Sequence, residues 1–266
     1  MFDAKDGKLT LVGADGFRLA VVRLDYPESE TGLIVGEGVA RINADSLKGV
    51  ANALRKAKRV RVSFEAGDVG KPMSLVIDTE LIRYKWADNE ASYPEYEKLI
   101  PTEFNISAHF DTIEAIKAVN SLKAVADSKA YPIDLTIGDG KLVMANPDNI
   151  GQAELVADTN GEGFVRLDGQ YLAEALKACG GMVELKLTNA LSPMLFSADG
   201  YQLVVMPMIT DKAQEQAKRD AEAKAEAEPV AEPVAEPVAE PVAEPVAVAP
   251  VAEAKQAKRS RAKVKA

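Results

Sequence analysis

Short runs of alternating apolar and polar residues, separated by turn residues, fill the first 209 positions of the chain. Asp6-Gly7-Lys8-Leu9 recurs as Asp139-Gly140-Lys141-Leu142, and an Asp-Gly pair between alternating runs predicts a β-hairpin. After each hairpin the pattern predicts a short strand, a helix and three more strands. These elements span residues 39–42, 44–57 (helix), 59–65, 73–78 and 81–86 in the first copy, and 165–167, 170–179 (helix), 183–187, 194–197 and 202–207 in the second. The repeated order predicts two copies of one α+β domain, each with antiparallel sheets and its helices on one face.

The two copies differ in length ahead of the hairpin. The second has roughly thirty extra residues, which predict a strand at 105–110 and a helix at 111–125. In that helix Ile113, Ile116, Val119 and Leu122 are spaced to form one buried face. The first copy has only residues 1–5 in the corresponding place. We therefore expect the first domain to lack its opening strand and helix, with apolar residues uncovered and residues 1–4 as a bare sheet edge.

Two explanations of this short start are open. Either the sequence is truncated or its start is misassigned, or another chain supplies the missing elements.

The C-terminal segment differs in composition from both copies. Residues 211–226 are rich in Ala, Glu, Lys and Gln and predict a solvated helix or a disordered segment. Ala-Glu-Pro-Val repeats at 227–246 predict an extended spacer, because proline removes backbone donors. A basic tip follows, with Lys258, Arg259, Arg261, Lys263 and Lys265. The predicted domains are thus 1–101, 102–209 and a low-complexity tail at 210–266.

Composition excludes several classes of protein. Of the 266 residues 47% are hydrophobic, which is enough for a core, and the single cysteine, Cys179, excludes a disulfide within the chain. No apolar stretch predicts a signal peptide or a membrane span, so a cytoplasmic location and no membrane partner are expected. The net charge of −9 argues against tight binding to nucleic acid. A protein that surrounds DNA without gripping it is compatible with that charge.

Catalytic and metal-binding patterns are missing from the sequence. One histidine, His109, and one cysteine do not make a zinc site, and His109 is expected to have a structural role on an apolar strand. The chain has no Gly-x-Ser-x-Gly, phosphate loop or dinucleotide fingerprint. The sequence therefore predicts a non-catalytic protein without a cofactor or metal.

Three separated signatures carry a resemblance to a known family. They are LTLVGADGFRLAVV at 9–22, ASYPEYEKLIP at 91–101 and YQLVVMPM at 201–208. Together they resemble the bacterial DNA polymerase III beta subunit, the sliding clamp, over residues 1–209. Chains of that family carry three such domains, and two chains close a six-domain ring around DNA. The resemblance implies that this chain corresponds to the central and C-terminal domains of a DNA replication processivity factor.

The resemblance also implies a DNA-facing surface. The helix at 44–57 has an apolar face of Leu47, Val50, Ala51 and Leu54, with cationic residues elsewhere. In the family such helices line the hole and contact phosphates loosely, without reading bases. On charge alone, a solvated helix face is the commoner explanation, and the resemblance is what favours DNA contact for Arg55, Lys56 and Lys58. The residues assigned to DNA are Lys48, Arg55, Lys56, Lys58, Lys117, Lys123 and Lys177.

A second implied site is an apolar groove between the two domains, which receives linear peptides from partner proteins. Carried over by position, its residues are Ala14, Gly16, Phe17, Arg18, Leu19, Pro94, Lys98, Leu99, Asp168, Tyr171, Leu191, Pro193, Val204, Val205, Met206, Pro207 and Met208. Leu, Val and Met suit an adaptable apolar surface, and Arg18 and Lys98 suit the orientation of a peptide. Leu19 and Val204 also fit an ordinary core. Ala14, Phe17 and Asp168 replace the threonine, histidine and asparagine common in the family.

The partners implied are double-stranded DNA without sequence preference, the DNA polymerase III catalytic subunit, the clamp loader, repair polymerases and mismatch-repair proteins, together with further copies in a homo-oligomeric ring. Two functions follow. The first is a processivity factor that tethers the polymerase by encircling DNA. The second is a peptide-binding adaptor, derived from a clamp, that does not close around DNA.

Overall fold

The computed structural model describes residues 1–25, 34–67, 72–90, 92–126, 131–148, 150–211 and 214. These residues fall within a single compact unit. The predicted spacer and basic tip, and nearly all of the predicted segment 211–226, lie outside the described residues. The domain boundaries at 101 and 209 stay predictions, because one sheet is shared between the two halves of the described chain.

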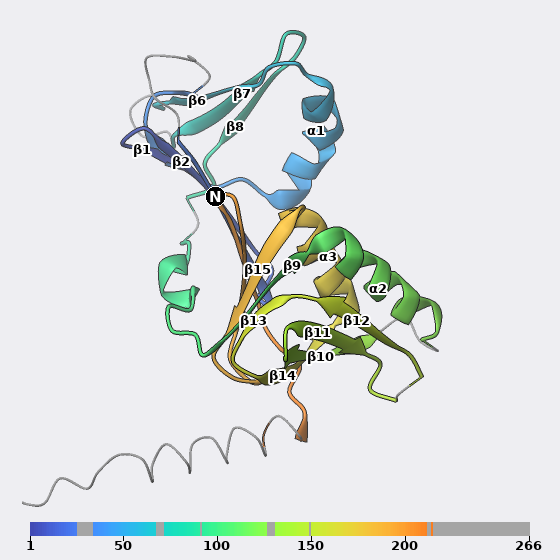
Figure 1. The fold of residues 1–266 in the computed structure, drawn as a ribbon. Helices are drawn as coiled ribbons and strands as arrows, with labels where there is room; N and C mark the ends of the chain where they lie inside the picture. Colours follow the sequence, from blue (N-terminus) through green and yellow to red (C-terminus); the bar gives the residue numbers. More distant parts are fainter. Residues whose placement is uncertain are drawn as a thin grey trace, which may run out of the picture. The chain divides into compact units, whose positions relative to one another are not determined.

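Two similar arrangements of strands follow one another along the chain (Figure 1). We call residues 1–90 the first repeat and residues 105–205 the second repeat. The first repeat contains β1 (Phe2–Lys5), β2 (Lys8–Ala14), β3 (Arg18–Asp25), β4 (Ile34–Val35), β5 (Gly38–Ala40), α1 (Ala44–Lys56), β6 (Arg61–Glu65), β7 (Ser74–Asp78) and β8 (Arg83–Ala87). The second contains β9 (Ile106–Asp111), α2 (Thr112–Ala124), β10 (Pro132–Gly138), β11 (Lys141–Ala145), β12 (Gln152–Val156), β13 (Asp158–Asn160), β14 (Gly163–Asp168), α3 (Gly169–Cys179), β15 (Met182–Leu187), β16 (Met194–Ala198) and β17 (Tyr201–Val205). The 3-10 helix η1 (Tyr96–Leu99) lies in the link between them.

The two predicted hairpins have the same turn geometry. Asp6 and Asp139 both have φ of 51°, and Gly7 and Gly140 both have φ of 72°. Positive φ at both central residues is the mark of a type I′ turn, which matches the twist of the flanking strands. The Asp-Gly prediction is therefore confirmed in both repeats.

The strand order confirms the internal repeat. In the second repeat one sheet runs β12-β11-β10-β14, and in the first the corresponding order is β3-β2-β1-β5. Because β1 pairs with β2 on one side and β5 on the other, the expectation of a bare edge at residues 1–4 is wrong. β5 returns to cover that edge, as β14 covers β10.

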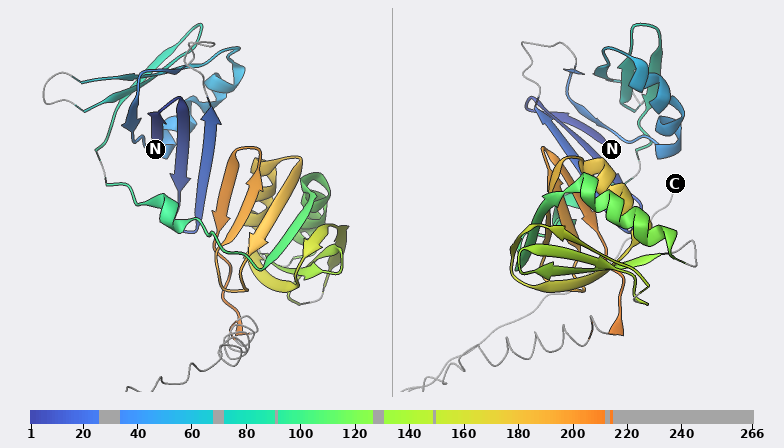
Figure 2. Two further views of the ribbon diagram at one scale, coloured as in Figure 1. Left: turned by 60° about the vertical axis from the view of Figure 1, so that its left-hand side comes forward. Right: turned by 45° about the vertical axis from the view of Figure 1, so that its right-hand side comes forward.

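The two repeats are joined edge to edge. β17, the last strand, pairs antiparallel with β3, from Tyr201 opposite Val22 to Val205 opposite Arg18. This pairing merges strands of both repeats into a nine-stranded sheet, and Figure 2 shows α1, α2 and α3 on one side of it. On that side Leu203 and Val205 belong to the core of the second repeat. On the opposite side Leu19 and Val204 belong to a smaller cluster under the link.

Two predicted helix faces need correction. Ile113 is 59% exposed and is not part of the buried face of α2, which consists of Thr112, Ala115, Ala118, Val119 and Leu122. The buried stripe begins at Thr112, directly after the N-cap Asp111, so the side chain of Ile113 lies one position off that stripe. The predicted core face of α1 is only half-buried, although Leu47 and Leu54 pack against the core of the first repeat. No helix among the described residues is long and apolar enough to cross a membrane.

Candidate functional site

The turn between β2 and β3 is fixed by one carboxylate. Asp15 Oδ1 accepts hydrogen bonds from the backbone N–H groups of Phe17 at 3.0 Å and Arg18 at 2.8 Å. Gly16 has φ of 91°, a conformation that favours glycine. The turn therefore presents Phe17, which is 60% exposed, at the end of the strand pair that joins the repeats.

Arg18 connects this turn to α3 of the second repeat. Its guanidinium forms ion pairs with Asp15 at 2.8 Å and Glu174 at 2.5 Å, and its Cζ lies 4.2 Å from the centre of the Tyr171 ring. Burial alone would lower the pKa of Arg18, but its hydrogen bonds to Glu174 and Asp15 raise it above the usual value. Hydrogen bonds from Arg18 and Gln170 lower the pKa of the Glu174 carboxyl. Arg18 is therefore charged and already paired, so it positions the tyrosine more than it offers a free cation.

The segment after β17 completes an apolar surface beside Arg18. Met206 donates its backbone N–H to Phe17 O at 3.0 Å, and Met208 donates to Arg166 O at 2.8 Å. The side chains of Met206 and Met208 are 43% and 41% exposed. The rings of Phe17 and Tyr171 are 6.3 Å apart. We call Phe17, Tyr171, Met206 and Met208 the junction surface.

Asp168 shapes the same region from the second repeat. Its side chain caps α3 by accepting from the N–H groups of Gln170 at 2.7 Å and Tyr171 at 3.3 Å. An aspartate is among the best N-cap residues, so the departure from asparagine keeps the capping role. The cap sets the direction of α3 and thereby the place of the Tyr171 ring.

The other predicted groove residues divide by exposure. Leu19 and Val204 are each 5% exposed and Val205 is fully buried, so their side chains stabilise the joint and are not available to a peptide. On the link, Pro94, Lys98 and Leu99 are exposed. Five more predicted groove residues are exposed or half-buried, namely Ala14, Gly16, Leu191, Pro193 and Pro207. The prediction of a peptide site at these positions stays untested.

Sequence reasoning missed Asp15 and Glu174. Asp15 is three residues from Arg18 in a turn, and a side chain that bonds the backbone N–H groups after it is a common turn signal. Glu174 is separated from Arg18 by 156 residues, so only the pairing of β3 with β17 brings the two together.

The predicted DNA-facing cations all lie on the surface. Lys48, Arg55, Lys56, Lys58, Lys117, Lys123 and Lys177 are exposed. Lys48 pairs with Asp45 at 3.3 Å, and Lys123 lies 5.3 Å from the centre of the Tyr131 ring. Among the described residues Arg55, Lys56 and Lys58 form no ion pair. The last turn of α1 and residue 58 after it therefore present three neighbouring cations without an ion pair among the described residues.

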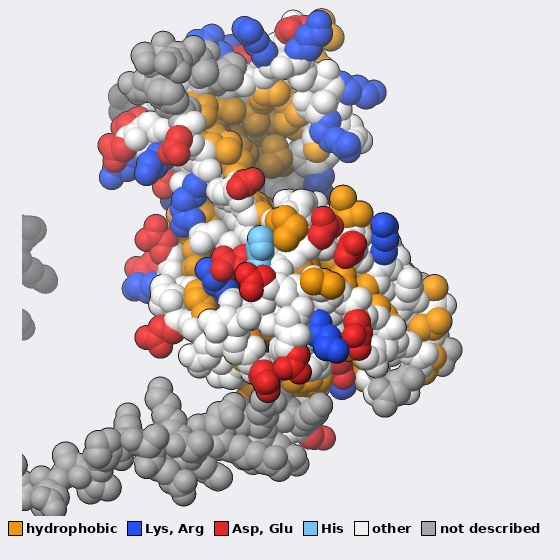
Figure 3. Space-filling view, in the orientation of Figure 1, with side chains coloured by type: hydrophobic (Ala, Val, Ile, Leu, Met, Phe, Trp, Pro, Cys, Tyr) orange, Lys and Arg blue, Asp and Glu red, His pale blue; other side chains and the backbone are white. Residues whose placement is uncertain are grey.

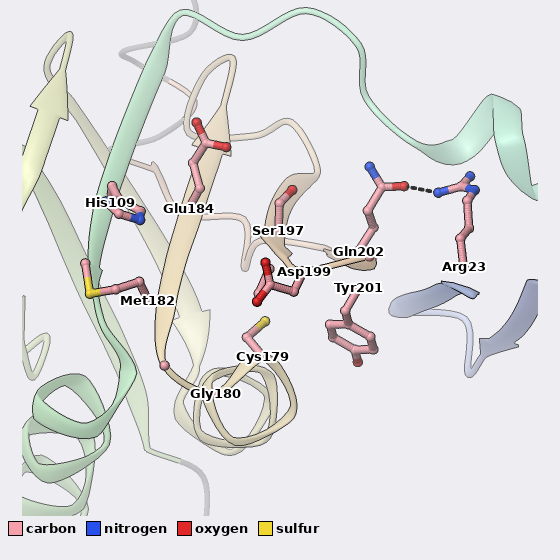
Figure 4. A pocket seen from close by; sticks show the side chains of 13 residues that line it. Arg23, His109, Cys179, Gly180, Met182, Glu184, Ser197, Asp199, Tyr201 and Gln202 are labelled. Carbon is pink, nitrogen blue, oxygen red and sulfur yellow. Dashed lines mark hydrogen bonds between the residues drawn. The ribbon is translucent and has the colours of Figure 1, made fainter. Parts of the chain in front are cut away.

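A cavity of about 1000 Å³ lies at one end of the nine-stranded sheet (Figure 4). His109, Glu184 and Cys179 contribute to its lining, and Arg23 donates a hydrogen bond to Gln202. His109 lies on β9 as predicted, with its side chain exposed, and its structural role stays a prediction. Burial raises the pKa of Cys179 to about 11, which keeps the thiol protonated at neutral pH and makes it a poor nucleophile.

Comparisons with known proteins agree with this geometry. No protein-family model matches the chain. The beta sliding clamp of Synechocystis is 26% identical over 222 residues, covering 75% of this chain and 55% of that protein. The beta sliding clamp of Caulobacter vibrioides is 24% identical over 216 residues, covering 76% of this chain and 54% of that protein.

The chain is thus similar in sequence to beta sliding clamps. It spans about half the length of these relatives. Among solved structures, the DNA polymerase III beta subunit of Pseudomonas aeruginosa superposes with a TM-score of 0.66 at 21% identity, over 78% of this chain and 57% of that one. The Thermotoga maritima beta subunit gives 0.63 at 20% identity, over 79% and 56%. The fold is thus that of the sliding clamps.

Proposed function

We propose that this chain works as a non-catalytic part of a sliding clamp, which tethers a replicative polymerase to DNA. The pairing of β3 with β17 is the observation that supports this most directly. It joins two clamp repeats edge to edge into a continuous sheet, with the three helices on one side (Figure 2). The sliding-clamp relatives support the same role. The site of action would be the bacterial cytoplasm, at the nucleoid.

Further copies of the chain can join through equivalent edges. β8 of the first repeat corresponds to β17 and ends its sheet, and β12 of the second corresponds to β3 and also ends its sheet. A β8 edge of one copy against a β12 edge of another would reproduce the observed junction. Head-to-tail contacts of this kind generate rings when the rotation closes. Val156 on β12 is 87% exposed and would be covered in such a contact.

Topological retention tests ring closure. Loaded with a clamp loader on circular primed DNA, the chain should stay bound until the DNA is linearised, because a ring slides off free ends. The variant Val156→Lys should lose retention, since a charge on an edge strand opposes edge pairing. Met182→Lys, on β15 inside the nine-stranded sheet, is the matched control because Met182 is 50% exposed and β15 is not an edge strand. Equal retention on linear and circular DNA would rule out encirclement and favour the adaptor.

We further propose that the junction surface binds linear peptides of partner proteins, including the polymerase III catalytic subunit, the clamp loader, repair polymerases and mismatch-repair proteins. Two exposed methionines beside Phe17 and Tyr171 offer apolar area that adapts to different side chains. The guanidinium of Arg18 packs against the face of the Tyr171 ring and holds it in place, so the surface is preorganised.

The P. aeruginosa clamp, which binds griselimycin, supplies a probe for this surface. Griselimycin should bind the chain saturably by calorimetry, and Phe17→Ala or Met206→Ala should each weaken binding by about tenfold, as loss of an interface anchor costs above 1 kcal/mol. Val156→Ala, on the edge strand β12 and 87% exposed, should leave the affinity unchanged. If the two junction variants bind as well as the parent chain, the site lies elsewhere.

The peptide-binding adaptor is the second candidate. The packing of α1 favours it, because only half-buried side chains such as Leu47 and Leu54 hold this helix against the sheets. An adaptor would bind griselimycin at the junction surface and fail topological retention, so the two experiments together separate the candidates.

A further inference from the structure

Three carboxylates are built into the frame of the junction surface. Asp15 accepts a hydrogen bond from the backbone N–H of Phe17 at 3.0 Å. Asp168 accepts one from the backbone N–H of Tyr171 at 3.3 Å. Glu174 follows Tyr171 by three residues on α3, so the two side chains are neighbours on one side of the helix. A ligand on the junction surface would therefore lie close to all three carboxylates.

Two of these carboxylates are firmly ionised at neutral pH. Burial raises the pKa of the Asp15 carboxyl, but hydrogen bonds from Arg18 and Phe17 outweigh burial and hold this pKa below its usual value. Hydrogen bonds from Arg18 and Gln170 lower the pKa of the Glu174 carboxyl as well. The side chains of Asp15 and Glu174 are 42% and 46% exposed, so both charges are accessible to a ligand.

A single guanidinium is shared between these two carboxylates. Arg18 forms ion pairs with both Asp15 and Glu174. Its Cζ also lies 4.2 Å from the centre of the Tyr171 ring, so it has no free side to offer a ligand. Asp168 forms no ion pair among the described residues. One guanidinium against three carboxylates leaves a formal charge of −2 at the junction surface.

Other cations around the surface do not remove this excess. Three of them each have a carboxylate partner of their own. The pairs are Arg166 with Asp134, Lys98 with Glu95, and Lys48 with Asp45. Lys177 lies on α3 about two helical turns beyond Tyr171, on the far side of Glu174. The junction surface thus combines exposed apolar side chains with an excess of negative charge.

We propose that the junction surface selects linear peptides that carry a lysine or arginine directly beside their apolar anchor residues. The anchors would cover the four side chains of the junction surface, and the cation would face Asp168 and Glu174. Complementary charge at an interface gives specificity more than raw affinity, because a like charge at the same place is repelled. This inference rests on the proposed peptide binding and adds the chemistry of the peptide that is bound.

The probe is a labelled peptide, Gly-Ser-X-Leu-Leu-Phe-Ser-Gly with an amidated C-terminus, in which X is lysine, alanine or aspartate. Binding to the full chain is measured by fluorescence anisotropy, and griselimycin should displace all three peptides. The lysine peptide should bind about tenfold more tightly than the aspartate peptide, with the alanine peptide between them. Raising the salt concentration from about 50 mM to about 500 mM should shrink this difference, because salt screens exposed charges.

The double variant Asp168→Asn with Glu174→Gln removes two charges and keeps the shape of both side chains. Asparagine is as good an N-cap as aspartate, so α3 keeps its start. The lysine peptide should bind this variant more weakly than the parent chain, and the aspartate peptide more tightly, so that their affinities differ by about twofold or less. A merely structural role of the two residues would shift all three peptides in the same direction.

The matched control, Asp158→Asn with Glu184→Gln, makes the same two chemical changes on β13 and β15. These strands carry no residue of the junction surface, and both positions lie opposite His109 in the sheet. Figure 3 shows acidic side chains beside this histidine. The control should keep the preference of the parent chain for the lysine peptide. Far-ultraviolet circular dichroism checks that both double variants are folded.

The outcomes separate this inference from the proposed function. Griselimycin binding without a preference for the lysine peptide keeps the peptide site and overturns the inference. An equal loss of preference in both double variants also overturns it, because net charge alone then explains the selection. If neither griselimycin nor any of the three peptides binds the folded chain, the proposed peptide site and the inference both fail.

Discussion

The substitution Leu172→Ala is expected to lower the free energy of unfolding by about 2–5 kcal/mol. Leu172 lies on α3 with 1% of its surface exposed, inside the core that α2, α3 and both sheets of the second repeat share. Removing its side chain loses apolar contact and leaves a cavity, because neighbouring helices and strands hold the walls apart. Urea unfolding at constant pH, followed by far-ultraviolet circular dichroism, measures the cost.

The matched variant is Leu47→Ala at the equivalent position of α1. Leu47 is half-buried beside an open cavity, so this change should cost at most about 1 kcal/mol. Trp86, the only tryptophan, lies in β8 of the first repeat and its fluorescence reports on that repeat alone. We expect this signal to change at a lower urea concentration than the circular dichroism. Equal costs for the two leucines would mean that the first repeat is as well packed as the second.

The helices and strands of this fold could be predicted because the turn and capping residues agree with the pattern of apolar positions. The Asp-Gly pairs set both hairpins, and their backbone angles are the same in the two repeats. The N-cap residues Asn43, Asp111 and Asp168 mark the starts of the three helices. Such signals act within a few residues of each other, so they can be read without knowing the tertiary fold.

What could not be predicted depends on pairing between distant strands. Ile113 was expected in the core, but the spacing of apolar residues does not show which face of the helix is buried. The packing of α2 against α3 decides that. The parallel pairing of β4 with β6 has no local signal, because the two strands lie far apart in the sequence. Residues 1–4 were expected to form a sheet edge. The strand that covers this edge, β5, lies at residues 38–40, so no signal near residues 1–4 predicts the pairing.

The candidate site also has features that the sequence predicts and features that depend on the folded structure. The signatures at 9–22 and 201–208 indicated correctly that these segments meet, and β3 and β17 are paired. Alternation then decides which side chains are available, because neighbours along a strand face opposite sides. Val204 and Val205 therefore pack into two different clusters on the two faces of the sheet, and neither is available to a peptide. The predicted groove is in this way reduced to the side chains at the strand ends and beyond.

Reversal of two charges on α1, Arg55→Glu with Lys56→Glu, is expected to weaken binding to double-stranded DNA by about tenfold or more at low salt. Both side chains are exposed in the last turn of α1, and neither has an ion-pair partner among the described residues. They are therefore free to approach phosphates. The slope of log affinity against log salt should decrease in magnitude by about 2, because each phosphate contact contributes about one unit.

The matched control reverses Lys5 and Lys8, which are exposed at the β1–β2 turn, away from the helices (Figure 1). Both double variants change the net charge by the same amount, so a general electrostatic effect would weaken DNA binding equally in the two. A DNA-facing role of α1 requires a larger loss, and a smaller salt slope, for the helix variant alone. Fluorescence anisotropy with a labelled duplex over a salt series measures both quantities. Equal losses for the two variants would mean that α1 is a solvated helix whose charges serve no contact with DNA.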